Sequence, residues 1–255
     1  MVLETIDIIN GLLSLTYLII AIIAGIKIGL VYFKTKKTEY LLVGILSVLI
    51  TEPWWPSAFS FVIIFTGINE NGLLYHPEIY FILGNILIPL SITIWTSIIT
   101  DFFWKDKQKI YVLISIIYGI IFEVIFFYYL ISDISMIGVM LSPVDSEYAI
   151  FIVINLVFVV VYTAITCFIF AYMTMRSRSP EIKLKGKFLY VAFSLFIVGS
   201  VLDGALSFQT TWLIFARLIL MACAFFLYSG FILPSFLKKL FLKSDDDKSK
   251  NFSNE

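Results

Sequence analysis

The sequence is poor in the residues that build metal and nucleophilic sites. It has one histidine, His76, and two cysteines, Cys167 and Cys223, among 255 residues. A single histidine cannot assemble a multi-histidine metal site, a serine–histidine centre or a zinc-protease centre. Both cysteines fall in apolar runs, which predicts buried thiols rather than a disulfide or a thiolate metal site. We therefore expect a protein that is not an enzyme and that holds no metal or other cofactor.

Charge is also scarce, and it cancels. Charged residues make up 14% of the chain, and 18 basic residues balance 18 acidic ones. Without an excess of positive charge, the composition gives no reason to expect a nucleic-acid partner. The first residues, MVLETIDIIN, contain no Lys or Arg, and no small-residue cleavage site follows the apolar run. This pattern lacks the form of a cleaved signal peptide.

Apolar residues dominate instead, at 60% of the chain, against about 45–50% in a soluble domain. A helix that spans a bilayer needs about 20 mostly apolar residues. Seven segments satisfy this requirement, at residues 6–33, 40–66, 78–104, 109–131, 148–175, 187–206 and 209–237. We predict an all-α integral membrane protein, with residues 1–237 forming a seven-transmembrane-helix bundle in the lipid bilayer.

Basic residues gather in alternate connections between these spans. The segments KTKKTE (34–39), KDKQK (105–109) and RSRSPEIKLKGK (176–187) are basic, whereas the other three connections contain no Lys or Arg. Basic loops remain on the cytoplasmic side of a membrane. The charge pattern therefore predicts a multi-pass protein of the cell membrane with its N-terminus outside and its C-terminus in the cytoplasm.

The end of the chain has a different pattern. In SFLKKLFLKS, which follows Pro234, apolar residues recur at helical spacing and the lysines fall largely between them. This pattern predicts a short helix on the inner leaflet. The last residues, SDDDKSKNFSNE, are too polar to bury a core. We expect residues 238–255 to form a cytoplasmic interfacial helix and a disordered tail.

Ionisable and amide side chains interrupt the apolar spans at one depth. At 1.5 Å per residue, Glu52 of span 2 and Arg217 of span 7 lie about 18 Å above the inner boundary, and Glu123 of span 4 lies about 20 Å above it. The same layer includes Asn85, Asn155 and Asp203. An ionised side chain that faces lipid at this depth costs at least about 2.5 kcal/mol, so the layer should face the bundle interior. We expect Arg217 to pair with Glu52, because helices 2 and 7 usually flank helix 1, or otherwise with Glu123.

Prolines and tryptophans lie near the same depth. Pro53 and Pro56 remove backbone donors and should kink span 2, and Pro89 should do the same in span 3. Carbonyl groups freed at such kinks are tolerated where protein or a wet cavity surrounds them. Trp54 and Trp55 supply amphipathic rings that either line such a cavity or belong to an interfacial belt.

Seven spans with an outer N-terminus and a surface helix after the seventh resemble the topology of microbial rhodopsins and G-protein-coupled receptors. A retinal pigment needs a lysine near the middle of span 7, and the charged residue there is Arg217, which cannot form a Schiff base. TDFFW in span 3 and GFILPSFL at the end of span 7 differ from the Asp/Glu-Arg-Tyr and Asn-Pro-x-x-Tyr patterns of the receptors. Sugar transporters of the SWEET type share the topology, but their proline–glutamine signature is missing here.

Three functions follow from these observations. In the first, a receptor-like or sensory protein takes a small-molecule ligand from the outer side at Arg217, Glu52 and Glu123, and a cytoplasmic protein partner docks at residues 176–187. The second is a proton-coupled small-molecule transporter, in which Glu52 or Glu123 takes up the proton. The third is a non-binding scaffold whose polar layer only specifies helix packing. The inner halves of the spans are poor in ionisable groups, which favours the receptor.

Overall fold

A computed structural model describes residues 3–206 and 210–242 of the chain. Within these ranges, seven helices are long and apolar enough to cross a membrane, which confirms the predicted multi-pass helical architecture. The elements are α1 (Thr5–Gly29), α2 (Val31–Thr35), α3 (Thr38–Leu49), η1 (Glu52–Trp54), α4 (Trp55–Phe65), α5 (Pro77–Asn85), α6 (Ile88–Phe103), η2 (Lys105–Lys107), α7 (Gln108–Ser132), η3 (Ile134–Met136), β1 (Gly138–Ser142), β2 (Asp145–Tyr148), α8 (Ile150–Met175), α9 (Pro180–Leu206) and α10 (Thr210–Ile232).

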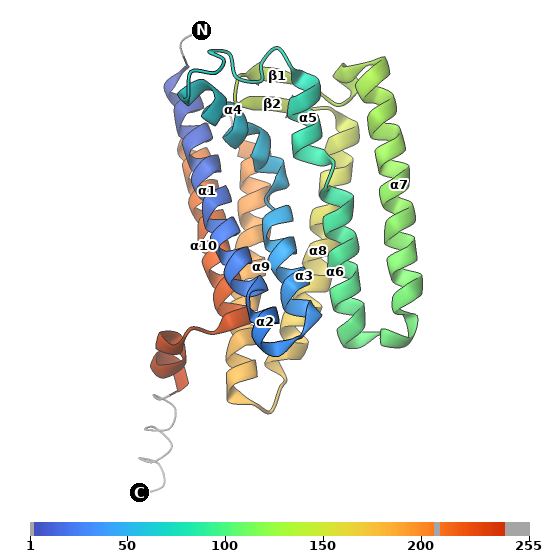
Figure 1. The fold of residues 1–255 in the computed structure, drawn as a ribbon, viewed down its shortest axis with the longest axis vertical. Helices are drawn as coiled ribbons and strands as arrows, with labels where there is room; N and C mark the ends of the chain where they lie inside the picture. The colour runs from blue at the N-terminus through green and yellow to red at the C-terminus, as the bar shows by residue number, and fades with distance from the viewer. Residues whose placement is uncertain (1–2, 207–209, 243–255) are drawn as a thin grey trace, which may run out of the picture.

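The long helices stand side by side, and α1 begins at the end of the bundle opposite to the one where α10 ends (Figure 1). Helix α1 packs against α3, α4 and α10, while α9 packs between α8 and α10. The elements of spans 2 and 7 therefore flank α1, in the order of a sequentially wound ring. Helix α7 lies at the edge of the bundle and packs mainly against α6 (Figure 1).

Spans 2 and 3 are interrupted at their prolines. Span 2 consists of α3, the short 3-10 helix η1 and α4, with Pro53 and Pro56 each in the first turn of a new helical segment. Span 3 consists of α5 and α6, and Pro89 lies in the first turn of α6. Proline is accepted at such positions because the first backbone N–H groups of a helix have no intrahelical partner.

Helices α1 and α3 approach each other closely at two glycines. A Cβ atom on Gly25 would lie 2.6 Å from the carbonyl oxygen of Gly44, and a Cβ atom on Gly44 would lie 2.7 Å from the carbonyl oxygen of Gly25. The two backbones are therefore in direct contact. Small residues at a helix interface permit this approach in membrane proteins, where packing drives helix association.

The connection between α7 and α8 forms a β-hairpin rather than a plain loop. Strands β1 and β2 are antiparallel, with Gly138 opposite Tyr148, and they lie across one end of the bundle (Figure 1). The two residues at the tip, Pro143 and Val144, are buried, as is Ile137 at the base. The hairpin therefore packs into the bundle. We call this end of the bundle the hairpin end.

The opposite end carries the basic connections, and we call it the basic end. There α9 begins at Pro180, seven residues before the predicted start of span 6 at residue 187. The backbone N–H of Lys183 donates to the carbonyl of Ser179, and proline at the first helical position favours an early helix start. Lys183, Lys185 and Lys187 consequently lie on a helix, and the connecting loop is short.

Residues 235–242 form a further short helix at the basic end. It buries Leu237 against Leu184 and Phe188 of α9 and leaves Phe236 and Leu240 exposed. An apolar outer face on a surface helix suits the membrane interface. The predicted disordered tail at residues 243–255 lies outside the described residues.

Candidate functional site

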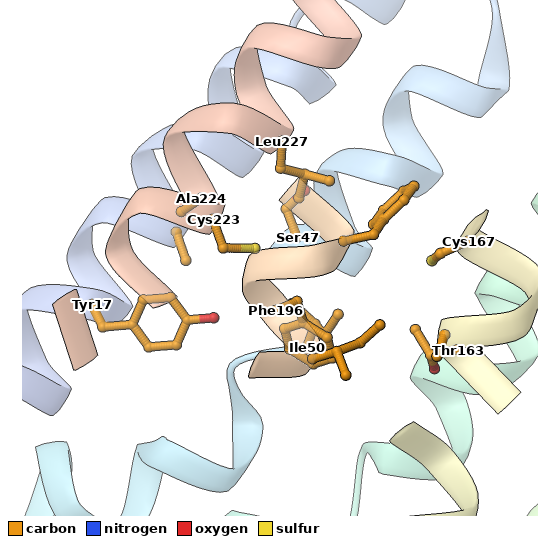
Figure 2. A pocket seen from close by; sticks show the side chains of 13 residues that line it. Tyr17, Ser47, Ile50, Thr163, Cys167, Phe196, Cys223, Ala224 and Leu227 are labelled. Atoms are coloured by element: carbon orange, nitrogen blue, oxygen red, sulfur yellow. The ribbon is translucent and has the colours of Figure 1, made fainter. Parts of the chain in front are cut away.

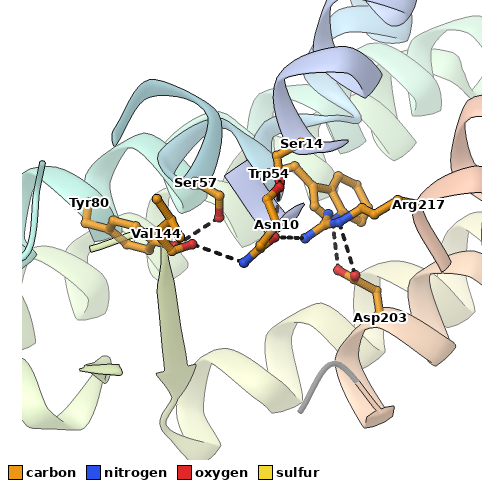
Figure 3. A network of polar contacts seen from close by, with 8 residues as sticks. All are labelled: Asn10, Ser14, Trp54, Ser57, Tyr80, Val144, Asp203 and Arg217. Carbon is orange, nitrogen blue, oxygen red and sulfur yellow. Dashed lines mark hydrogen bonds and ion pairs between the residues drawn. The ribbon is translucent and has the colours of Figure 1, made fainter. Parts of the chain in front are cut away.

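Arg217 of α10 is the centre of a buried polar cluster at the hairpin end. Its Nε lies 3.4 Å from Oδ1 of Asp203 on α9, and its Nη2 donates a hydrogen bond of 2.9 Å to Oδ1 of Asn10 on α1. The guanidinium group lies 5.6 Å from the centroid of the Trp54 ring in η1. Trp54 in turn donates through Nε1 to Oδ2 of Asp203, at 2.7 Å (Figure 3). Side chains of three elements, α1, η1 and α9, thus surround the guanidinium group that α10 carries.

The tip of the hairpin completes this network. The Val144 carbonyl oxygen accepts hydrogen bonds from Nδ2 of Asn10 at 3.2 Å and from the Tyr80 hydroxyl at 3.1 Å (Figure 3). The Ser57 hydroxyl is 3.1 Å from that of Tyr80, and Ser60 donates to the carbonyl of Pro143. Two tip carbonyls therefore accept hydrogen bonds from side chains of α1, α4 and α5. The network is continuous from α5 through the hairpin to α9.

The partner predicted for Arg217 was wrong. Among the described residues, the guanidinium pairs with Asp203 and with neither Glu52 nor Glu123. Asp203 lies in the last turn of α9, which packs along α10. The long side chain of Arg217 reaches toward the hairpin end from a backbone position deeper in the bundle. Equal backbone depth therefore did not imply contact.

Glu52 instead joins the two interrupted spans. Its side chain is fully buried, and Oε1 accepts a hydrogen bond of 2.6 Å from the backbone N–H of Leu87. Leu87 is the N-cap residue of α6, where backbone N–H groups have no intrahelical partner and a negative charge is stabilised by the helix dipole. Glu52 is thus an N-terminal cap supplied by a neighbouring span. Its Oε2 has no hydrogen-bond partner among the described residues.

The other members of the predicted layer lie apart from Arg217. Asn85 is fully buried and donates within α5 to the carbonyl of Phe81, at 2.9 Å. Asn155 of α8 accepts a hydrogen bond from the Tyr118 hydroxyl of α7, and this contact links two peripheral helices. Glu123 of α7 is half-buried, and its Oε2 has no hydrogen-bond partner in the described part of the chain. Among the described residues, none of these three side chains forms a hydrogen bond or an ion pair with Arg217.

The two adjacent tryptophans have different environments. Trp54 is 6% exposed and belongs to the Arg217 cluster, where its ring meets the Tyr17 ring edge-on. Trp55 is half-buried, and its Nε1 donates to the Thr51 hydroxyl at 2.9 Å, within its own span. Of the two rings, only that of Trp54 contacts the cluster.

Asn10 and Ser14 are site residues that the sequence reasoning missed. Ser14 donates to Oδ1 of Asn10, at 3.3 Å, and both side chains are buried in α1. Asp7, Asn10 and Ser14 recur at intervals of three and four residues, which places them on one face of a helix. This spacing was the available signal. Polar residues near the end of a span are also expected at the membrane–water interface. For that reason the spacing alone did not identify a site.

The hairpin adds a carboxylate, Asp145, to the surroundings of Arg217. The pKa of Asp145 is raised to about 6, mainly by burial; the backbone N–H of Ser146 and the Arg217 guanidinium oppose this rise, and the carboxylates of Asp203 and Asp7 add to it. Asp7 is 6% exposed, and its Oδ2 accepts from the backbone N–H of Glu4. Neither Asp7 nor Asp145 forms an ion pair within the described residues.

Arg217 has hydrogen-bonding capacity that the described residues do not use. The residue is 4% exposed, and its Nη1 is buried without a hydrogen-bond partner in residues 3–206 and 210–242. Its contact with Asp203 through Nε is an ion pair without hydrogen-bond geometry. A guanidinium group is a donor whose fork matches a carboxylate. The arrangement can therefore bind an acceptor group.

The centre of the bundle provides little room for a ligand. A cavity between α1, α3, α8, α9 and α10 has a volume of about 40 Å³, and its lining is mostly apolar, including Phe196, Cys223 and Leu227 (Figure 2). Pockets for drug-sized ligands are typically about 300–1,000 Å³. The polar groups that could recognise a ligand are at the hairpin end.

These features define the class of protein: a multi-pass helical bundle with a buried arginine cluster beneath an inserted hairpin. No protein-family model, curated protein or solved structure matches the chain. Within residues 3–206 and 210–242, no group of three or more His, Cys, Asp or Glu side chains is placed to hold a metal ion.

Proposed function

We propose that the protein is a receptor-like or sensory protein of the cell membrane, and that its small-molecule ligand binds from the hairpin end at Arg217. The observation that supports this proposal is the unused Nη1 of Arg217, a charged group that is 4% exposed. Ionisable residues inside a membrane bundle mark functional sites by default, because their burial is costly. Binding would shift the hairpin tip and the helices that hydrogen-bond to it.

The interior toward the basic end favours a receptor over a carrier. A buried apolar cluster there includes Ile28, Val43, Ile98 and Phe170, and the central cavity that adjoins it has mostly apolar walls. A carrier must offer its substrate a path to both faces of the membrane. The polar site therefore communicates more directly with the hairpin end.

Thermal unfolding of the purified protein against a chemical panel tests this function. The panel contains amino acids, simple carboxylates, amines, sugars and nucleosides. We expect at least one compound to raise the unfolding temperature of the wild type, because a ligand at 100 times its Kd adds about 2.7 kcal/mol. The same compound should not stabilise Arg217→Gln. The matched control is Arg178→Gln, which makes the same change at an exposed position and should respond like the wild type.

Two results would count against a ligand site. In the first, no compound in the panel stabilises the wild type. In the second, the stabilising compounds act equally on Arg217→Gln and on the wild type. Either result favours the scaffold function, in which the polar cluster only holds the helices together.

The proposed orientation places the hairpin end outside the cell and the basic end in the cytoplasm. It rests on the basic connections at one end of the bundle. Cys167 and Cys223 are 3% and 6% exposed, so a cysteine introduced at exposed Asp133 or Arg178 can be labelled selectively. An impermeant thiol reagent should label Asp133→Cys in intact cells and Arg178→Cys only after lysis. The reverse order would contradict the orientation.

We also propose that a cytoplasmic protein docks at residues 176–187, where the short loop and the first turns of α9 expose basic side chains. A photo-crosslinker attached at Arg178→Cys should capture this protein from the cytoplasmic fraction. If the crosslinked products are the same with and without the cytoplasmic fraction, the proposed partner is excluded.

A second candidate is a proton-coupled transporter. It is favoured by Glu52, a fully buried carboxyl group whose Oε2 has no hydrogen-bond partner among the described residues. A transporter in liposomes should move a compound only when a proton gradient is present, and Glu52→Gln should abolish this dependence. Uptake that ignores the gradient would remove this candidate.

A further inference from the structure

We propose that the ligand of the Arg217 site is a small zwitterion, which presents a carboxylate to Arg217 and an ammonium group to the neighbouring aspartates. This inference rests on the proposed function, because it names the chemical class of the ligand that the same site would bind.

The carboxylate follows from the donors that meet at the site. Nη1 of Arg217 is buried without a hydrogen-bond partner in the described chain, and an acceptor with negative charge is its best match. Nδ2 of Asn10 and the Tyr80 hydroxyl also point toward the site, where both donate to the Val144 carbonyl (Figure 3). A ligand carboxylate can replace that backbone carbonyl as their acceptor. The hairpin tip thus occupies donors that a ligand would use.

The ammonium group follows from the local excess of negative charge. Asp203 already compensates Arg217. Asp145 directly follows Val144, whose carbonyl accepts from Asn10, and Asp7 lies one helical turn before Asn10; neither carboxylate forms an ion pair among the described residues. A simple anion would be attracted by the Arg217 guanidinium but repelled by these carboxylates. A simple cation would leave Nη1 of Arg217 without an acceptor. A molecule that carries both charges satisfies both sets of groups.

The aromatic wall of the site agrees with a small cationic group. Trp54 presents its ring to the Arg217 guanidinium at 5.6 Å, and the edge-on contact with Tyr17 holds that ring in place. The electron-rich faces of such rings attract ammonium groups as well as guanidinium groups.

The experiment measures thermal unfolding of the full chain in detergent with the proteinogenic α-amino acids, β-alanine and 4-aminobutyrate. Each compound that stabilises the wild type is compared with its N-acetyl derivative, which lacks the ammonium charge, and with its amide, which lacks the carboxylate. We expect each analogue to bind at least tenfold more weakly than the parent. An analogue that binds as tightly as its parent overturns the inference.

Two variants test the residues. Asp145→Asn should weaken zwitterion binding without affecting the N-acetyl derivative, whereas Arg217→Gln should weaken both. Glu147→Gln is the matched control, because Glu147 is an exposed carboxylate on the same strand and its loss should leave binding unchanged. If Arg217→Gln does not fold, the comparison of Asp145→Asn with Glu147→Gln still decides the inference. Equal effects of these two variants would overturn it.

The outcomes also separate this inference from the proposed function. If a simple carboxylate, amine or uncharged compound stabilises the wild type but not Arg217→Gln, the site binds a ligand and the zwitterion is wrong. If no compound of any class stabilises the wild type, both the ligand class and the proposed function fail.

Discussion

Arg217 and Asp203 should be coupled energetically, and Arg217 and Glu52 should not. Arg217→Gln removes the cation that compensates Asp203, and the two side chains are 4% and 15% exposed. Removing one member of a buried ion pair typically costs about 3–5 kcal/mol. Because Asp203 retains some exposure, we expect a loss near the lower limit, about 3 kcal/mol.

A double-mutant cycle measures this coupling. Arg217→Gln and Asp203→Asn each leave the other charge without its partner, while the double variant leaves two neutral amides that can hydrogen-bond. Residues in direct contact show interaction energies of about 0.5–3 kcal/mol, and we expect about 2 kcal/mol for this pair. In the parallel cycle with Glu52→Gln, the losses should add to within about 0.5 kcal/mol, because Glu52 hydrogen-bonds to Leu87.

The assay is equilibrium unfolding in mixed micelles, with a denaturing detergent as the titrant and far-UV circular dichroism as the signal. All variants are compared at one pH and one salt concentration, since ion-pair energies depend on both. A coupling of about 2 kcal/mol between Arg217 and Glu52, together with additivity between Arg217 and Asp203, would refute the site geometry described here.

Three further predictions concern the surrounding structure. Gly44→Ala should lower the free energy of unfolding by about 1–3 kcal/mol, because the new methyl group would meet the α1 backbone at 2.7 Å. The control is Gly204→Ala, where no described atom lies within 4 Å of the new methyl group. This variant should be close to neutral in the same unfolding assay. Glu52→Ala should lower the thermal unfolding temperature, since an unpaired buried N–H at Leu87 costs about 1–3 kcal/mol. Glu52→Gln keeps an acceptor for this N–H and should lower the unfolding temperature less. A larger decrease for Glu52→Gln than for Glu52→Ala would contradict the capping role. The pKa of Asp145 is raised from 3.8 to about 6, so the folded state binds this proton more tightly than the unfolded chain does. The stability of the wild type relative to Asp145→Asn should therefore fall as the pH rises from about 4 to about 6. A stability difference that stays constant across this range would show that Asp145 is not buried.

The spans and their interruptions could be predicted from the sequence because both depend on local properties. Hydropathy over about 20 residues identifies a spanning helix, and Pro53, Pro56 and Pro89 lie where spans 2 and 3 are interrupted. The hairpin was not predicted. Its strands are short and lack strict alternation, and they are held by burial of Ile137 and Val144 in the bundle, which is a tertiary effect.

The polar contacts were harder to predict than the depths of the residues. Counting residues along a helix gives the height of a Cα atom but not the direction that its side chain takes around the bundle. Glu52 and Arg217 have similar heights along their spans. The Glu52 carboxylate nevertheless caps α6, whereas the Arg217 side chain reaches toward Asp203. Asn10, near the start of span 1, has a role that depends on contacts with α10 and the hairpin, which are distant in the sequence.

The central claim, that Arg217 binds a ligand beneath the hairpin, is tested most directly by NMR of the protein labelled with ¹⁵N-arginine. The chain contains three arginines, Arg176, Arg178 and Arg217, and the first two are exposed. Each amino acid of the panel is added in turn while the guanidinium signals are recorded. We predict that a compound which stabilises the protein shifts the Arg217 signal and leaves the Arg176 and Arg178 signals unchanged. A stabilising compound that leaves the Arg217 signal unchanged would contradict the claim.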